Sequence, residues 1–201
     1  EGYLARALVR LWYEFNYEGA KSDFDRALEI NPNFADAYLW LEMYWTYVGH
    51  DYERALEANR KASRLSPLDS RADVRLGTLQ MLFGRLEASE KSHRQALLEN
   101  PEASVSHLGL GDTLFRMGRH EEAISEVDVA VSLAGRPTPW LGMLAGFLGA
   151  AGEEEKAEEI LAELNARAKA GYVSGFWMAV ALGGLGRYSE AFSELDRAIQ
   201  E

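Results

Sequence analysis

The stretch "RYSEAFSELDRA" (Arg187–Ala198) decides the fold, because it has a near-copy upstream, "RHEEAISEVDVA" (Arg119–Ala130). Seven of the twelve positions are identical, and the two segments lie 68 residues apart. Two explanations are open: a duplicated chemical site rich in Ser, Glu and Asp, or one part of a structural repeat. Self-similarity at a fixed period is the signature of repeat architectures. The spacing of similar residues in the rest of the chain therefore decides between the two explanations.

Small residues recur along the whole chain at an almost constant interval. Successive members of the series are 35, 34, 34, 34 and 34 residues apart. A turn glycine follows nearly the same period, and the duplicated segments are two periods apart. The pattern indicates a structural repeat. The small residues are Ala20, Ala55, Ser89, Ala123, Ala157 and Ala191, and the glycines are Gly49, Gly84, Gly118, Gly152 and Gly186.

Each period is interpreted as a helical hairpin. The glycine is expected to end the first helix in a left-handed conformation, which suits a residue without Cβ. The small residues mark a close approach of two helices, and prolines then end the second helix. A hairpin this short cannot bury its apolar stripe alone, so neighbouring hairpins must stack. The prolines are Pro32, Pro67 and Pro101, and the residues expected to cap the next helix are Asn33, Asp69, Ser104 or Thr138.

Several short motifs resemble those of tetratricopeptide repeats. They are the "LG" pairs at Leu76-Gly77 and Leu110-Gly111, "YEGA" (Tyr17–Ala20) and "EEA" (Glu121–Ala123), together with the closing prolines. The resemblance covers essentially the whole chain. It implies an all-α, right-handed superhelical solenoid as a single array of about six units, and because the pattern starts and stops abruptly, we expect a fragment of a longer chain. The units span residues 1–34, 35–69, 70–103, 104–137, 138–171 and 172–201.

Three segments also resemble the tetratricopeptide regions of bacterial multidomain regulators. They are "INPNFADAYLWL" (Ile30–Leu41), "LSPLDSRADVRLG" (Leu65–Gly77) and "YVSGFWMAVALGGLGRYSEAFSELDRA" (Tyr172–Ala198). This resemblance implies an alternative function as a sensory or regulatory domain attached to a DNA-binding, kinase or cyclase domain.

Composition excludes several classes of function. The formal net charge of −11 argues against general binding to the phosphate backbone of nucleic acids. The absence of cysteine excludes disulfides and thiolate metal sites but leaves the compartment open, with the cytoplasm favoured. The two charge-free runs, residues 137–152 and 171–186, are broken by glycines and shorter than the roughly 20 apolar residues of a membrane helix. We therefore expect neither a nucleic-acid partner nor a membrane span.

In arrays of this type the first helix of each pair lines an inner, concave wall. Residues one helical face away from the core stripe should form it. The wall is rich in aromatic residues, methionine and arginine, which are enriched at protein interfaces. The candidate partner-binding residues are Arg6, Trp12, Tyr13, Trp40, Met43, Tyr47, Arg71, Arg75, Phe115, Arg116, Met143, Phe176 and Trp177.

The wall predicts a protein-interaction scaffold that binds a peptide or helix of a partner of unknown identity. Internal packing of some of the aromatic residues is the structural alternative, and homo-oligomerisation, for example a homodimer, is the functional one. A clamp for acidic chaperone tails is disfavoured, because only Arg71 and Arg75 match its basic positions. The arginines can still hold one carboxylate of another peptide, or simply face water.

No arrangement of residues predicts catalysis, a cofactor or a metal. The histidines lack the spacing of a zinc-binding helix, and the serines lack a nucleophile-elbow context. "GLGR" (Gly184–Arg187) and "GLGD" (Gly109–Asp112) are too short for a phosphate loop. The sequence thus predicts a protein that is not an enzyme.

Overall fold

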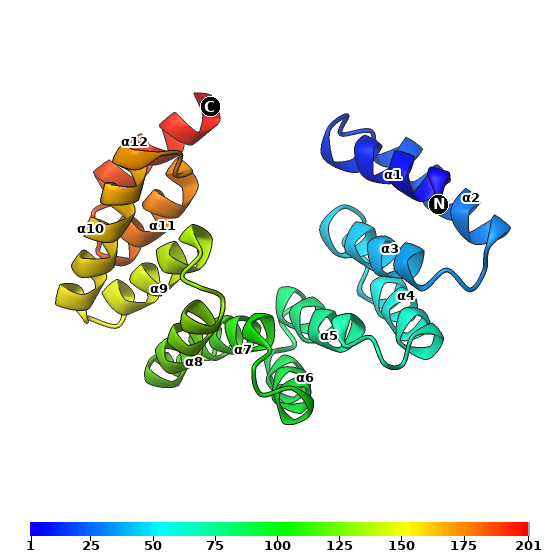
Figure 1. Cartoon of the computed structure of the whole chain (residues 1–201), viewed down its shortest axis with the longest axis horizontal. Coiled ribbons are helices and arrows are strands. Elements are labelled where there is room, and N and C mark those ends of the chain that lie inside the picture. The colour runs from blue at the N-terminus through cyan, green and yellow to red at the C-terminus, as the bar shows by residue number, and fades with distance from the viewer. Residues whose placement is uncertain (201) are drawn as a thin grey trace. The chain divides into compact units, whose positions relative to one another are not determined.

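The computed structural model describes residues 1–200, and this part of the chain contains twelve α-helices and no strand (Figure 1). The helices form six consecutive pairs, as the 34-residue period predicts. They belong to two compact units, residues 1–92 and the residues from His93 onward, with the boundary inside the sixth helix. The all-helical fold of about six repeated pairs is confirmed.

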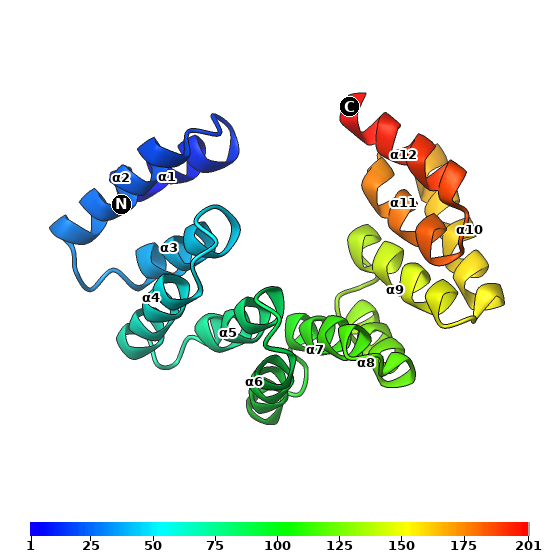
Figure 2. The same ribbon diagram turned by 180° about the vertical axis from the view of Figure 1, so that it is seen from behind.

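The first unit contains the first two helix pairs, the first helix of the third pair and the N-terminal half of its second helix. In the first two pairs the first helix packs on the second, and α2 and α4 also contact the first helix of the next pair (Figure 2). The bounds are α1 Gly2–Trp12, α2 Tyr17–Ile30, α3 Ala35–Tyr47, α4 Tyr52–Leu65, α5 Arg71–Leu82 and α6 Leu86–Glu99, the last of which extends past residue 92.

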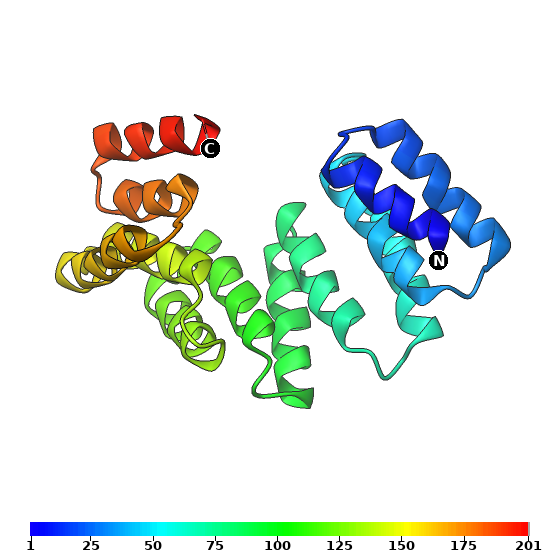
Figure 3. The same ribbon diagram turned by 45° about the horizontal axis from the view of Figure 1, so that its top comes forward.

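The second unit repeats this arrangement. Figure 3 shows α11 lying between α9 and α12, in agreement with its contacts to both helices. The bounds are α7 Ser104–Arg116, α8 His120–Leu133, α9 Thr138–Ala150, α10 Glu154–Ala170, α11 Gly175–Gly184 and α12 Tyr188–Gln200.

The turn inside each hairpin contains a left-handed residue. Gly84, Gly118, Gly152 and Gly186 have φ between 71° and 85°, as predicted. The prediction is wrong for Gly49, because the left-handed residue there is His50, with φ of 47°. Gly49 is required for space instead, since an added Cβ would lie 2.3 Å from the Trp45 ring. In the first hairpin Phe15 takes the left-handed position, with φ of 51°.

The expected caps of the first helices differ from the structure. Phe34 and Ala103 occupy the N-cap positions that Asn33 and Ser104 were expected to fill, and Pro137 takes the place expected for Thr138. None of these three residues caps with a side-chain hydrogen bond. Side-chain caps are present at α2 and α4, where Asn16 and Asp51 accept a backbone N–H, and at α11, where Ser174 accepts the Phe176 N–H. Near α5, Asp69 accepts the Arg71 N–H although Ser70 is the N-cap.

The periodic small residues lie where the paired helices meet. Ala20, Ala55, Ser89, Ala123 and Ala157 are completely buried. A larger side chain at these positions would push the helices apart, because protein interiors are close-packed. The duplicated stretch that marks the repeat is therefore part of the framework of the fold.

A glycine track on α9 is used for packing within the second unit. An added Cβ at Gly142 would lie 2.7 Å from the Trp177 carbonyl oxygen, and one at Gly146 would lie 3.0 Å from the Val180 carbonyl oxygen. An added Cβ at Gly184 would lie 2.1 Å from the Gly146 carbonyl oxygen. The glycines let α11 approach α9 closely, so this track is filled by the chain itself.

Within residues 1–200, no helix combines the length and the apolar character needed to cross a bilayer. The same residues hold no group of three or more His, Asp or Glu side chains arranged to bind a metal ion.

Candidate functional site

An apolar hollow of about 150 Å³ opens between α1, α2 and α3 in the first unit. Trp12 is the last residue of α1, while Met43 and Tyr47 lie one turn apart on α3. Such spacing places both side chains on one face of the helix. The residues that line it, called the aromatic hollow below, are Leu11, Trp12, Phe15, Tyr17, Met43, Tyr47 and Val48.

Aromatic side chains at the rim of the hollow remain accessible to water. Trp12, Tyr47 and Phe15 keep 47%, 50% and 68% of their surface exposed. Burial of apolar surface is favourable by roughly 25 cal/mol per Å², so covering the exposed part of these rings with a ligand would be stabilising. Scattered apolar residues are normal on a surface, but a contiguous group marks an interaction site.

The local backbone directs Phe15 toward this hollow. The left-handed conformation at Phe15 costs about 1–2 kcal/mol for a residue with a side chain. Its turn is held by the Asn16 N–H, which donates to the Arg10 carbonyl oxygen at 2.8 Å. Phe15 and Tyr17 are not among the wall residues that the sequence predicts. The signal for Phe15 was its aromatic side chain at the position where glycine is expected.

Of the other two predicted aromatic residues in the first unit, one is exposed and one is packed against the core. Tyr13 follows Trp12 directly and is 82% exposed. Trp40 is half-buried and packs against the apolar cluster that contains Leu4, Phe24 and Tyr44. Trp12, Met43 and Tyr47 thus come together in the aromatic hollow, whereas Trp40 serves the packing of α3 on its neighbours.

Arg6 on α1 is bound to a carboxylate of the same chain. Its Nε donates to Asp23 Oδ2 at 2.7 Å, and its Nη2 donates to Asp23 Oδ1 at 2.6 Å. Arg10 adds a third contact, from Nη1 to Asp23 Oδ2, also at 2.7 Å. Because Arg6 donates these hydrogen bonds and both arginines carry positive charge, the pKa of the buried Asp23 carboxyl is lowered.

Arg75 on α5 also has a buried carboxylate partner. Its Nε donates to Glu42 Oε2 at 2.6 Å, and Glu42 is only 2% exposed. The Thr46 hydroxyl donates to the other carboxylate oxygen at 2.9 Å. Burial nevertheless outweighs these contacts and raises the pKa of the Glu42 carboxyl.

The remaining two predicted arginines are also paired. Arg71 contacts Asp69 and Asp36, each at 2.6 Å, and Arg116 contacts Asp112 at 3.0 Å. A partner carboxylate at any of the four predicted arginines would therefore compete with an internal one. None of the four is therefore free to act as a carboxylate clamp.

The second unit has its own set of wall residues. Phe115 is half-buried and stacks on Phe147 with ring centroids 3.9 Å apart, and Met143 is half-buried against the core. Phe176 is 48% exposed and meets Trp177 edge to face at 4.8 Å. The structure thus leaves Phe176 accessible and uses Phe115, Met143 and much of Trp177 in packing between helices.

Comparisons with known proteins define the fold. No protein-family model matches the sequence, and no match is found among curated proteins. Among solved structures, PilF of Pseudomonas aeruginosa is 22% identical with a TM-score of 0.69, and 99% of this chain aligns with 86% of that one. PilW, a type IV pilus biogenesis factor, is 17% identical with a TM-score of 0.75, and 97% of this chain aligns with 90% of it.

A third structure makes the class explicit. A thermophilic TPR protein of Thermus thermophilus is 19% identical with a TM-score of 0.71, and the match covers all of this chain and 98% of that protein. These similarities confirm the resemblance drawn from the 34-residue period. The chain has the tetratricopeptide-repeat fold.

Proposed function

We propose that the chain is a protein-interaction module whose inner helices bind a peptide or helix of a partner protein. The aromatic hollow is its anchor point. The observation that carries the proposal is the group of exposed aromatic side chains around one hollow, contributed by α1, α2 and α3. Tryptophan and tyrosine in such settings dominate the energy of protein interfaces.

The chemistry of the hollow defines the expected ligand. Its lining offers aromatic rings, a methionine and aliphatic groups, without a charged side chain. Methionine adapts its shape to different partners, and the tyrosine hydroxyls give polar contacts at the rim. We therefore expect one large apolar or aromatic side chain of the partner to insert here.

The experiment is a selection of peptides from a random display library on the immobilised chain, followed by titration of one selected peptide. The double variant Trp12→Ala, Tyr47→Ala should bind it at least about 30-fold more weakly, since two anchor residues are lost. The matched control is Leu98→Ala, Tyr172→Ala, which removes two residues that are 78% and 74% exposed outside the wall. Equal binding by wild type and the Trp12, Tyr47 variant contradicts the proposal.

A second candidate function, self-association, has a specific observation in its favour. Tyr188, Phe192 and Ile199 of α12 are 64%, 67% and 83% exposed. Their spacing places them along one stripe of the helix. Sedimentation over a wide concentration range tests this function. A monomer at all concentrations rules it out, and a dimer lost on Phe192→Ser, Ile199→Ser supports it.

A further inference from the structure

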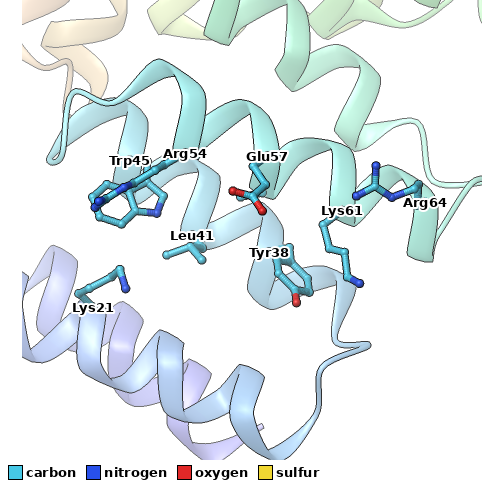
Figure 4. Close-up of a pocket in the computed structure, with 9 residues that line it drawn as sticks. Lys21, Tyr38, Leu41, Trp45, Arg54, Glu57, Lys61 and Arg64 are labelled. Atoms are coloured by element: carbon cyan, nitrogen blue, oxygen red, sulfur yellow. The ribbon is translucent and has the colours of Figure 1, made fainter.

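A second hollow, of about 570 Å³, lies between α2, α3 and α4 (Figure 4). It is larger than the aromatic hollow and within the range of small-ligand sites. Its lining combines cationic side chains with an apolar floor, in a chain whose net charge is −11. The residues that line it, called the basic groove below, are Lys21, Tyr38, Leu41, Trp45, Arg54, Glu57, Ala58, Lys61 and Arg64.

The basic groove and the aromatic hollow use opposite faces of α3. Tyr38, Leu41 and Trp45 are spaced i, i+3 and i+7, so they share one face of the helix. Met43 and Tyr47 share another face, and at 100° per residue the two faces differ by about 170°. The groove is therefore a separate surface, and the function proposed for the aromatic hollow does not require it.

Aromatic rings in the groove hold the cationic groups in place. The Arg54 guanidinium carbon lies 4.6 Å from the Trp45 ring centroid, and Figure 4 shows the two side chains stacked. Lys21 Nζ lies 5.3 Å from the same ring, and Lys61 Nζ lies 6.0 Å from the centroid of Tyr38. Cation–π contacts of this kind restrain the side chains, so less entropy is lost when an anion binds.

Two of the four cations are already neutralised and two are not. Lys21 pairs with Asp25 at 2.6 Å, and Arg54 pairs with Asp51 at 3.3 Å. Within residues 1–200, Lys61 and Arg64 form no ion pair. Lys61 and Arg64 differ in this respect from the four arginines predicted for the inner wall, each of which is paired with a carboxylate. The groove thus presents unused positive charge at the C-terminal end of α4.

We propose that the basic groove binds an acidic peptide segment of a partner protein. Carboxylates of the peptide pair with Lys61 and Arg64, while an apolar side chain packs on Leu41 and the edges of Tyr38 and Trp45. From Arg54 to Arg64 the α4 helix rises about 15 Å. This length matches about five residues of extended peptide.

The same residues disfavour a nucleic acid. Single-stranded nucleic acids need free aromatic faces on which bases stack. Here Arg54 and Lys21 both lie against Trp45. Glu57 in the groove and the nearby Asp25 and Asp51 would also repel a continuous phosphate backbone, whereas a peptide can place its carboxylates only at the unpaired cations.

The test measures binding of a fluorescein-labelled peptide of alternating glutamate and leucine to the full chain at low salt. The variant Lys61→Glu, Arg64→Glu should weaken binding at least about tenfold, because it replaces attraction by like-charge repulsion. The matched control, Lys91→Glu, Lys169→Glu, reverses two exposed lysines on α6 and α10 and should change binding less than about twofold. Far-UV circular dichroism checks that both variants keep their helices.

Several results would overturn the proposal. They are undetectable binding of the peptide, equal weakening by the control variant, and equal binding of a peptide with glutamine in place of glutamate. Tighter binding of oligothymidine or inorganic phosphate at the same residues would assign the groove to phosphate ligands. If the wild type self-associates and the variant Lys61→Glu, Arg64→Glu does not, the groove would be assigned to a second copy of the chain. Trp12→Ala should leave binding of the acidic peptide unchanged, so a failure here is distinct from a failure of the proposed function.

Discussion

The stability of the second unit should depend on pH through His93. The side chain of His93 is completely buried, and within residues 1–200 neither ring nitrogen has a hydrogen-bond partner. The ring lies so close to Gly109 that an added Cβ there would be 2.3 Å from Cε1. Burial without a polar partner lowers the pKa of His93 from 6.5 to about 4.

The sign and size of the effect follow from proton binding. Above pH 6.5 the imidazole is neutral in the folded and unfolded states and contributes no pH dependence. Between 6.5 and about 4 the unfolded state binds a proton that the folded state excludes, so the free energy of unfolding decreases as the pH falls. The loss is about 2 kcal/mol at pH 5 and approaches about 3.4 kcal/mol well below pH 4.

The assay is urea denaturation followed by far-UV circular dichroism at about pH 7.5 and about pH 5, for wild type and His93→Leu. Other titrating groups are the same in both proteins, so they cancel in the comparison. The wild type should lose about 2 kcal/mol more than the variant between the two pH values. Equal losses in the two proteins, or an NMR titration of His93 near pH 6.5, would refute the reasoning.

Two further predictions concern packing and charge. Arg75→Met should destabilise the first unit by about 3–5 kcal/mol in urea denaturation, because Glu42 is left buried without its cation. The Arg71 side chain is 59% exposed, so the control variant Arg71→Met should lower the free energy of unfolding by less than about 1 kcal/mol. Equal effects of the two substitutions would contradict the argument. Gly184→Ala should destabilise the second unit by about 1–3 kcal/mol, because the new Cβ would meet Gly146. Gly183→Ala, where a Cβ meets nothing within 4 Å, should be neutral or stabilising by about 0.5–1 kcal/mol, and a melting-temperature comparison that finds the reverse order would refute the assigned contact.

The sequence predicted the fold because a repeat period is a property of the chain itself. Ala20 and Ala55 identify helix contacts without knowledge of the tertiary structure, and Gly84 identifies a turn by its lack of a side chain. His50 shows where this reasoning fails, since the left-handed conformation falls on His50 and not on Gly49.

The site was less predictable, because its chemistry depends on contacts between distant residues. Arg75 and Glu42 are 33 residues apart, and no local pattern distinguishes a paired arginine from a free one. The basic groove does not follow from the first helices of each pair, because three of its four cations lie on α4. The spacing of Arg54, Lys61 and Arg64 along one face was a signal that could have located it.

The most direct test of the central claim is to map where a selected peptide contacts the inner wall. A benzophenone group replaces the apolar anchor of the peptide, and the cross-linked residue is identified by mass spectrometry. Binding in the aromatic hollow predicts cross-links to Met43, Trp12 or Tyr47. Cross-links confined to residues outside the lining of the aromatic hollow would contradict it.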